Sequence, residues 1–290
     1  MVRNKVLVVL SLLWSSFVAE AQGVMFKSNE DFGITYTIYG DDQQYPQKIL
    51  DQELLRIQYH CQLAFEDENR KPLEAEYILQ VGRDFSKYYQ AIQHKADSLL
   101  DNGPRLNARY QLYEKANSLF VQECYYVNRR TREITVTGRM ITEDFSYVET
   151  LPVIDWRLTD SCRTVCGYVC RMATGLFRGR EYEAWYAEEI PASVGPWKLQ
   201  GLPGAILLVE ETKHTCLFEA VEIISTRGNI RKNEYPYIEV SRKQYAKMQN
   251  QFLENHGLFA SQHTSRVSGL RIQVVKKSMP LPRPVWLELE

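Results

Sequence analysis

The chain has 290 residues, of which 44% are hydrophobic, 12% aromatic and 24% charged. This balance excludes a disordered or low-complexity protein and leaves enough apolar residue for a substantial core. The 35 basic and 36 acidic residues give a formal net charge of -1, so a nucleic acid has no general electrostatic attraction to the chain. We therefore expect a globular protein that binds no nucleic acid.

The first 21 residues have the order of a secretory signal peptide, with positive, then apolar, then small side chains. Arg3 and Lys5 precede an apolar stretch, and Ala19 and Ala21 occupy the two positions that a signal peptidase reads. We expect cleavage near Ala21. The mature chain has no apolar run of the roughly 20 residues that span a bilayer, so we expect no transmembrane segment in it. The expected location is the periplasm or the outside of the cell.

Cysteine usage agrees with an exported chain. An even number of cysteines in an oxidising compartment favours disulfides, although six cysteines allow 15 pairings and the sequence does not choose among them. If Val165–Thr174 is extended, Cys166 and Cys170 lie about 13 Å apart at ~3.3 Å per residue, too far for a disulfide between them. The candidates for disulfide formation are Cys61, Cys124, Cys162, Cys166, Cys170 and Cys216.

Most of the mature chain alternates apolar and polar residues with a period of two, which predicts antiparallel β-structure. In Leu55–Phe65, for example, Ile57, Tyr59 and Cys61 fall on one face of a strand. Similar patterns predict further strands at 134–138, 165–170, 180–186, 205–210 and 216–224, the second and third of these joined as a hairpin by a turn within 174–179. We therefore expect a mainly β protein of the α+β class.

Two segments have apolar residues at helical spacing. Ser86–Leu100 ends before an Asn-Gly-Pro sequence, and Ser241–Asn255 begins with a serine at the N-cap position. Residues 279–290 are rich in proline and cannot form a central strand, so we expect a tail or an edge segment there. The simplest organisation is one domain over residues 22–290 with one or two peripheral helices.

The segment Trp156–Glu210 contains the motif Gly201-Leu202-Pro203-Gly204-Ala205-Ile206. It resembles the GLPGLI family of exported bacterial proteins, named for Gly-Leu-Pro-Gly-Leu-Ile, with Ala205 in place of one leucine. The family's other typical residues are present as Gly167-Tyr168, Cys170, Ala173, Trp185-Tyr186, Ile190-Pro191 and Gly195-Pro196. The resemblance implies export and a strongly curved antiparallel sheet or half-barrel, similar to periplasmic lipoprotein carriers. It implies no reaction, no cofactor and no catalytic residue.

The motif also has a physical interpretation. Gly201 and Gly204 bracket Leu202-Pro203, so the backbone can adopt positive φ at either end of a tight turn, and proline fixes φ between them. Together with the turn at Gly195-Pro196, this predicts a structured loop over Ile190–Gly204 that lies across the sheet. The loop is either a folding element alone or one wall of an apolar cleft. In the second case the ligand-binding residues are Trp185, Tyr186 and Trp197.

No catalytic or metal site has a local signature. The histidines form no His-x-His or His-x-x-x-His pair, so we expect no metal. Cysteines spaced four apart can hold a soft metal, but disulfides explain them more simply. Ser193 lacks a Gly-x-Ser-x-Gly context and is typical of a turn, and the adjacent Glu188 and Glu189 face opposite ways on a strand.

Three hypotheses of function follow from the sequence. The first is an exported non-enzymatic protein that binds an apolar ligand, a peptide or an outer-membrane partner in a concave sheet. The second is an assembly factor of the bacterial envelope that pairs through a sheet edge. The third is a hydrolase that uses Ser193 or a carboxylate. A cavity of several hundred Å³ would favour the first, a filled sheet with a long exposed edge the second, and a histidine beside Ser193 the third.

Overall fold

The computed structural model describes residues 24–29, 34–39, 46–94, 122–140, 143–255, 259 and 283–285. The predicted signal peptide lies outside the described residues, as does most of the predicted tail. Short ribbons of two antiparallel strands are formed by β1 (Val24–Asn29) with β2 (Ile34–Tyr39) and by β3 (Gln47–Gln52) with β15 (Asn229–Asn233).

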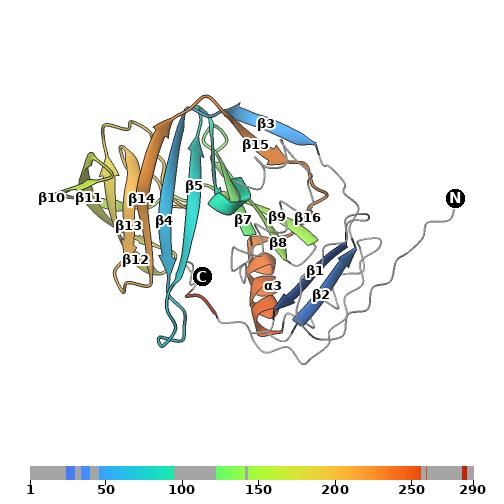
Figure 1. Cartoon of the computed structure of the whole chain (residues 1–290). Coiled ribbons are helices and arrows are strands. Elements are labelled where there is room, and N and C mark those ends of the chain that lie inside the picture. The colour runs from blue at the N-terminus through green and yellow to red at the C-terminus, as the bar shows by residue number, and fades with distance from the viewer. Residues whose placement is uncertain are drawn as a thin grey trace, which may run out of the picture.

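Twelve strands form one large sheet in the order β10-β11-β12-β13-β14-β4-β5-β6-β7-β8-β9-β16 (Figure 1). Neighbouring strands are antiparallel, except that β16 runs parallel to β9. The bounds are β4 (Leu55–Leu63), β5 (Leu73–Val81), β6 (Phe85–Gln90), β7 (Gln122–Asn128), β8 (Glu133–Met140), β9 (Glu143–Thr150), β10 (Trp156–Val165), β11 (Tyr168–Phe177), β12 (Arg180–Ala187), β13 (Ala205–Glu211), β14 (Cys216–Ser225) and β16 (Ile238–Glu239). The fold is mainly β, as the sequence predicts.

The sheet is strongly curved but not closed. β9 and β10 lie near opposite ends of the strand order, yet only residues 151–155 connect them. A chain of that length spans at most about 20 Å, so the two ends of the sheet must approach each other. In Figure 1 the sheet bends round from β10 through β4 and β5 to β8 and β9. The expected half-barrel is therefore present.

The concave face carries the core. Ile57 and Tyr59 of β4 are fully buried, and their cross-strand partners on β5 are Leu79 and Tyr77. Because side chains alternate along each strand, this register places the apolar residues of both strands on the same side. Tyr77 stacks on Tyr88 of β6 with ring centroids 4.9 Å apart. Large aromatic side chains thus fill the concave side of the curved sheet.

Two tight turns differ from the sequence-based expectation. Cys166 and Gly167 have φ values of 48° and 83°, and Arg178 and Gly179 have 50° and 77°. Two consecutive residues at positive φ are typical of a type I′ turn, which joins antiparallel strands in a two-residue hairpin. The predicted strand 165–170 is therefore wrong, because its centre is the turn between β10 and β11. The second turn is also shorter than the predicted segment 174–179.

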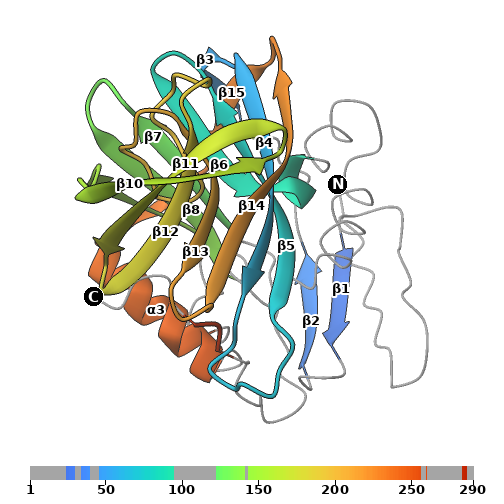
Figure 2. The same ribbon diagram turned by 90° about the vertical axis from the view of Figure 1, so that its left-hand side faces the viewer.

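The β10–β11 hairpin folds back over the outer face of the sheet. Its register shifts between Leu158 and Cys162, which marks a bulge in β10. Beyond the bulge, the guanidinium of Arg163 lies 5.2 Å from the ring centroid of Trp185 on β12. Figure 2 shows the hairpin crossing in front of β13 and β14. The far half of this hairpin therefore covers part of the outer surface of β12–β14.

One predicted helix is confirmed and the other is partly wrong. α3 (Arg242–Glu254) begins at Ser241, whose side chain and that of Gln244 form a capping box. The predicted helix at Ser86–Leu100 begins instead as the strand β6, and helical structure starts at Ala91. Residues 86–89 alternate between the two faces of the sheet, so their pairing with β5 and β7 overrides the helical spacing. Residues beyond His94 lie outside the described part.

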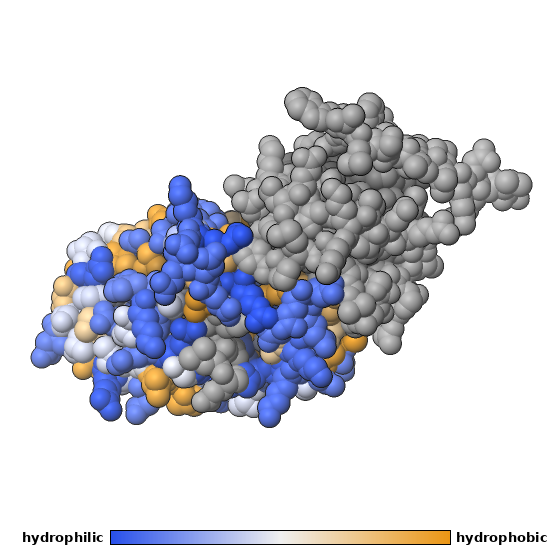
Figure 3. Space-filling model, turned by 90° about the horizontal axis from the view of Figure 1, so that it is seen from below, coloured by the Kyte–Doolittle hydropathy of each residue, from blue (hydrophilic) through white to orange (hydrophobic). Residues whose placement is uncertain are grey.

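Within the described residues, no helix is long and apolar enough to cross a membrane. Pro284 of the tail makes an isolated antiparallel bridge with Phe65, at the end of the β4–β5 hairpin. The face seen from below in Figure 3 shows hydrophobic residues of the described part as small separate patches among hydrophilic ones. That face therefore presents no broad apolar surface among those residues.

Candidate functional site

The glycine–proline loop, residues 188–204, connects β12 to β13 and lies against the concave face of the sheet. It is fixed at its base because Ala205 N donates to Ile190 O at 3.1 Å and Ile206 N donates to Val194 O at 2.9 Å. Its side chains Leu199 and Leu202 are almost completely buried. The predicted loop packed across the sheet is therefore present.

The glycines of the loop serve two different purposes. Gly201 has a φ of +103°, which side chains other than glycine rarely adopt. Gly204 does not have positive φ, contrary to expectation. A Cβ at Gly204 would lie 2.2 Å from the backbone oxygen of Ala187, and one at Gly195 would lie 2.3 Å from that of Leu199. These two glycines are required because the backbone approaches them closely.

A buried lysine that is not among the predicted site residues anchors the loop. Lys198 is 2% exposed, and its ammonium forms an ion pair with Glu149 of β9 and donates to the hydroxyl of Tyr147 at 3.2 Å. Glu149 also faces Arg178 at 3.1 Å and Arg242 of α3 at 3.9 Å. One carboxylate therefore joins the loop, the β11–β12 turn and the helix to β9.

Aromatic rings surround this ion pair. The Lys198 ammonium lies 5.5 Å from the ring centroid of Tyr147 and 6.0 Å from that of Tyr125, distances at which ring faces attract a cation. Tyr125 donates to Glu123, and burial raises the pKa of Tyr125, with the Glu123 carboxylate raising it further. Tyr125 therefore stays protonated and acts as a hydrogen-bond donor at neutral pH.

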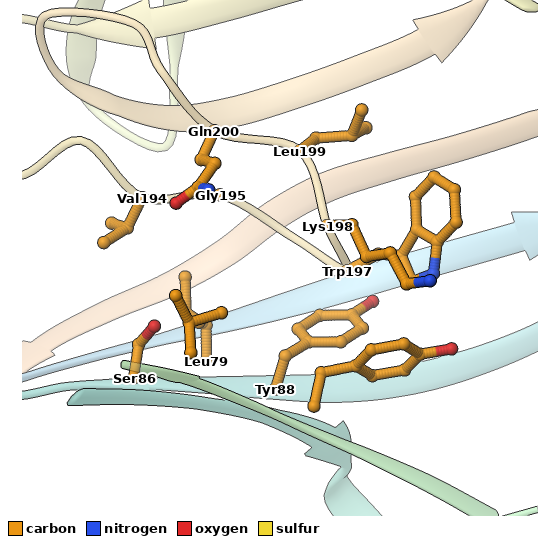
Figure 4. Close-up of a pocket in the computed structure, with 11 residues that line it drawn as sticks. Leu79, Ser86, Tyr88, Val194, Gly195, Trp197, Lys198, Leu199 and Gln200 are labelled. Carbon is orange, nitrogen blue, oxygen red and sulfur yellow. The ribbon is translucent and has the colours of Figure 1, made fainter. Parts of the chain in front are cut away.

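The cavity beside the loop is very small. In Figure 4, Val194, Trp197 and Lys198 of the loop lie opposite Leu79 and Tyr88 of the sheet. The space between them has a volume of about 10 Å³, at the lower limit for one water molecule. The loop therefore lies close against the sheet at this point, and this cavity has no room for an organic ligand.

The three predicted ligand-binding residues do not converge. Trp185 and Tyr186 are adjacent on β12, and Trp185 contacts Arg163 on the outer face while Tyr186 is fully buried. Trp197 lies in the loop and packs edge-on against Phe177, with ring centroids 5.5 Å apart. Trp197 also has a φ of 55°, which is unusual for a bulky residue and shows how tightly its surroundings hold it.

The polar residues weighed as catalytic groups have structural partners. The hydroxyl of Ser193 accepts a hydrogen bond from Gly201 N at 3.1 Å, and no histidine contacts it among the described residues. Glu188 and Glu189 are exposed, and Glu188 lies 3.5 Å from Arg171. No group of three or more potential metal ligands occurs in the part of the chain that the structure describes.

The predicted disulfides are absent from the structure. All six candidates, Cys61, Cys124, Cys162, Cys166, Cys170 and Cys216, are free thiols. The physical reason is that several sulfur atoms point to other partners: Cys61 contacts the Tyr88 hydroxyl at 3.4 Å, and Cys124 donates to Gln93 Oε1 at 3.0 Å. Cys166 lies in a tight turn, so its separation from Cys170 is not that of one continuous strand.

The strand β10 is one edge of the large sheet. Among the described residues it pairs only with β11, and its residues 160–164 are all exposed. An edge strand carries backbone N–H and C=O groups without a partner, which another strand can satisfy. Two large apolar side chains near it are exposed, Leu158 at 57% and Val169 at 59%. This edge is therefore an accessible surface to which another strand can bind.

Comparisons with known proteins give one family match and a similarity of fold to solved structures. A family model described as "Protein of unknown function (Porph_ging)" matches residues 178–208, which include the glycine–proline loop. A comparison with curated proteins finds no match. The chain is similar to the solved structure of PNGF-II in space group P21, with a TM-score of 0.50 and 16% identity over 68% of this chain. The solved structure of PNGF-II in space group C2 gives a TM-score of 0.48 and 16% identity over 67% of this chain. The chain spans about a third of the PNGF-II chains, 33% and 32%, and at this identity the likeness concerns the fold alone.

Proposed function

We propose that this chain is an exported, non-enzymatic, GLPGLI-like domain that binds another protein by adding one of its strands to the free edge of β10. The observation that carries the proposal is the contrast between a cavity of only about 10 Å³ beside the loop and a ten-residue edge strand that is largely exposed. Carriage of an apolar ligand inside the sheet has no such support, because the loop occupies that space. The family model over residues 178–208 supports the GLPGLI assignment, since it covers the same motif.

The geometry of β10 indicates which half of the strand binds a partner. The bulge between Leu158 and Cys162 interrupts a regular edge, which leaves the stretch from Cys162 to Val165 as the pairing segment. Val165 pairs with Tyr168 next to the two-residue turn, and such closing pairs exchange both backbone hydrogen bonds. The alternation of antiparallel ladders then directs the N–H and C=O of Thr164 towards the free edge.

The test removes one outward N–H group. A Thr164→Pro variant lacks this donor but loses no bond to β11, and its neighbour Arg163 already has the extended conformation that a following proline requires. Thr164→Ala is the matched control, because it changes the same side chain and retains the N–H. A photo-crosslinking amino acid at position 162, introduced into each variant, reports the partner in intact cells.

We expect a discrete crosslinked product of higher mass with Thr164 and with Thr164→Ala, and its loss with Thr164→Pro. Circular dichroism of the purified proline variant must match that of the alanine variant, so that the loss reflects binding rather than folding. Equal crosslinking by the proline and alanine variants, or no product from position 162 in any of them, would refute pairing through β10.

A further inference from the structure

A second unusual lysine lies on the opposite face of the sheet from Lys198. Lys87 of β6 is 8% exposed, and its ammonium lies 4.1 Å from the ring centroid of Tyr89 and 5.6 Å from that of Tyr126. In the part of the chain that the structure describes, this ammonium makes no ion pair and no hydrogen bond to another side chain. Buried lysines normally have an anionic partner, because an unpaired buried charge is costly.

Two further lysines lie beside the same aromatic rings. The ribbon β3–β15 contacts β6, and in its register Lys232 lies directly opposite Lys48. The Lys232 ammonium lies 5.9 Å from the ring centroid of Tyr126 and 5.4 Å from that of Tyr237. Burial lowers the pKa of Lys232, and the charge of Lys48 lowers it further, although Glu234 and Glu239 act in the opposite direction. Neither lysine forms an ion pair among the described residues.

Two ammonium groups lie near one tyrosine ring, and neither has an ion-pair partner among the described residues. The ammonium groups of Lys87 and Lys232 each lie within 6 Å of the Tyr126 ring centroid. The distance between the two ammonium groups therefore cannot exceed the sum of these two distances. The ring faces attract both cations, but they do not neutralise the repulsion between them. The three lysines also differ in exposure: Lys48 is exposed, Lys232 is half-buried and Lys87 is buried.

We propose that Lys87, Lys232 and Lys48 bind one phosphate or sulfate group, which supplies the missing negative charge. A tetrahedral dianion suits several neighbouring lysines better than a carboxylate, because it carries more charge and has acceptors in several directions. Lysine is a compact cation with three rotatable donors, so it does not need the planar geometry that arginine requires. This proposal is independent of strand pairing at β10.

The test compares Lys87→Met with wild type and with Lys213→Met, an exposed lysine in the β13–β14 turn. Isothermal titration with inorganic phosphate, in chloride buffer of constant ionic strength and pH, gives the affinity. We expect Lys87→Met to weaken binding by at least about tenfold, since it removes a buried charge-assisted contact. Lys213→Met should bind phosphate as wild type does.

Thermal unfolding distinguishes a lysine that binds an anion from a lysine that only supports the fold. Without phosphate, Lys87→Met should be as stable as wild type or more stable, because an unpaired buried charge has been removed. With saturating phosphate, only wild type and Lys213→Met should gain stability. Lower stability of Lys87→Met in the absence of phosphate, or no binding of phosphate or sulfate to wild type, would overturn the proposal.

A second ligand, phenyl phosphate, identifies the source of the anion. If phenyl phosphate binds as tightly as inorganic phosphate, the site accepts a phosphate group on a larger molecule. If only the inorganic ions bind, the site is specific for the free anion.

If Lys87→Met does not fold, Lys232→Met takes its place, and we expect its affinity for phosphate to fall several-fold. Unchanged affinity in that variant would equally refute the site.

Discussion

Lys198 of the glycine–proline loop and Glu149 of β9 form an ion pair in the interior of the curved sheet. The same carboxylate faces Arg178 and Arg242, so three cations share one anion. This relationship joins four segments that are distant in sequence. It indicates that the loop is an integral part of the folded domain.

The two members of this pair should differ in their effect on stability. Glu149→Gln removes the carboxylate that faces all three cations, so we expect the free energy of unfolding to fall by about 3–5 kcal/mol. Lys198→Met leaves Glu149 with two arginines, and we expect a smaller loss of about 1–3 kcal/mol. Chemical denaturation measures both. The control is Arg130→Met, in a surface pair with Asp84, where the loss should stay below about 1 kcal/mol. A larger effect of Lys198→Met than of Glu149→Gln would contradict this view of the cluster.

Alanine substitutions at Gly204 and Gly167 test two different effects on stability, a steric clash at Gly204 and a positive φ at Gly167. Gly204→Ala places a Cβ 2.2 Å from the backbone oxygen of Ala187, so the loop must move, and we expect a loss of about 3 kcal/mol. Gly167 has a φ of +83° but open space around it, so Gly167→Ala should cost about 1 kcal/mol. Urea denaturation of the two variants checks the order. Similar losses would mean that the close approach at Gly204 is not what requires glycine.

Asp51 should make stability depend on pH in acid solution. Its carboxylate accepts hydrogen bonds from the backbone N–H groups of Asp84 at 2.7 Å, Phe85 at 3.0 Å and Gln52 at 2.8 Å. Burial raises the pKa of Asp51, but these bonds and the charge of Arg129 outweigh burial, so the pKa lies below the usual value. The stabilisation is therefore complete above the unfolded-state pKa of about 3.9 and is lost as the pH falls through the lower folded-state pKa.

The variant Asp51→Asn isolates this contribution. We expect it to lower the free energy of unfolding at pH 7 by about 1 kcal/mol, because one acceptor oxygen is lost from a partly exposed group. The difference between wild type and variant should shrink below pH 4. Urea denaturation at pH 7, 5 and 3 measures it, and a difference that grows towards pH 3 would contradict the assignment.

The cysteines should react in the order of their exposure. Cys162 is exposed, whereas burial raises the pKa of Cys216 to about 12 and that of Cys170 to about 11. Since the thiolate is the reactive form, we expect iodoacetamide at pH 8 to modify Cys162 first and the buried thiols only after denaturation. Mass spectrometry without reductant should count six modified cysteines in denaturant. A count of four or fewer would show that disulfides form in the protein.

The strands and one helix were predictable because their determinants are local. Alternation over Leu55–Phe65 identified β4 and its buried face, and the serine at 241 identified the start of α3. The start of the helix predicted at Ser86–Leu100 is wrong because apolar residues from Tyr89 onward have helical spacing, and only pairing with β5 and β7 shows that residues 86–90 form a strand. The turn at Cys166 was missed since a cysteine at positive φ has no clear signal in sequence.

The loop was predictable as a folded element, but its chemical role was not. Glycine and proline signal turns directly, whereas the partner of Lys198 lies in another strand and the sequence gives no sign of their contact. A lysine between two apolar residues, Trp197 and Leu199, was the available signal. The aromatic residues chosen as ligand contacts were large and apolar, and those properties equally favour burial in the core, where Tyr186 and Trp197 lie.

The short connection between β9 and β10 has a mechanical consequence. Residues 151–155 tie together two margins of a sheet whose intervening strands could otherwise splay apart. Flattening of the sheet is therefore limited by the length of this tether rather than by side-chain packing alone. Lengthening it with inserted glycines would relax that limit while leaving every strand sequence intact.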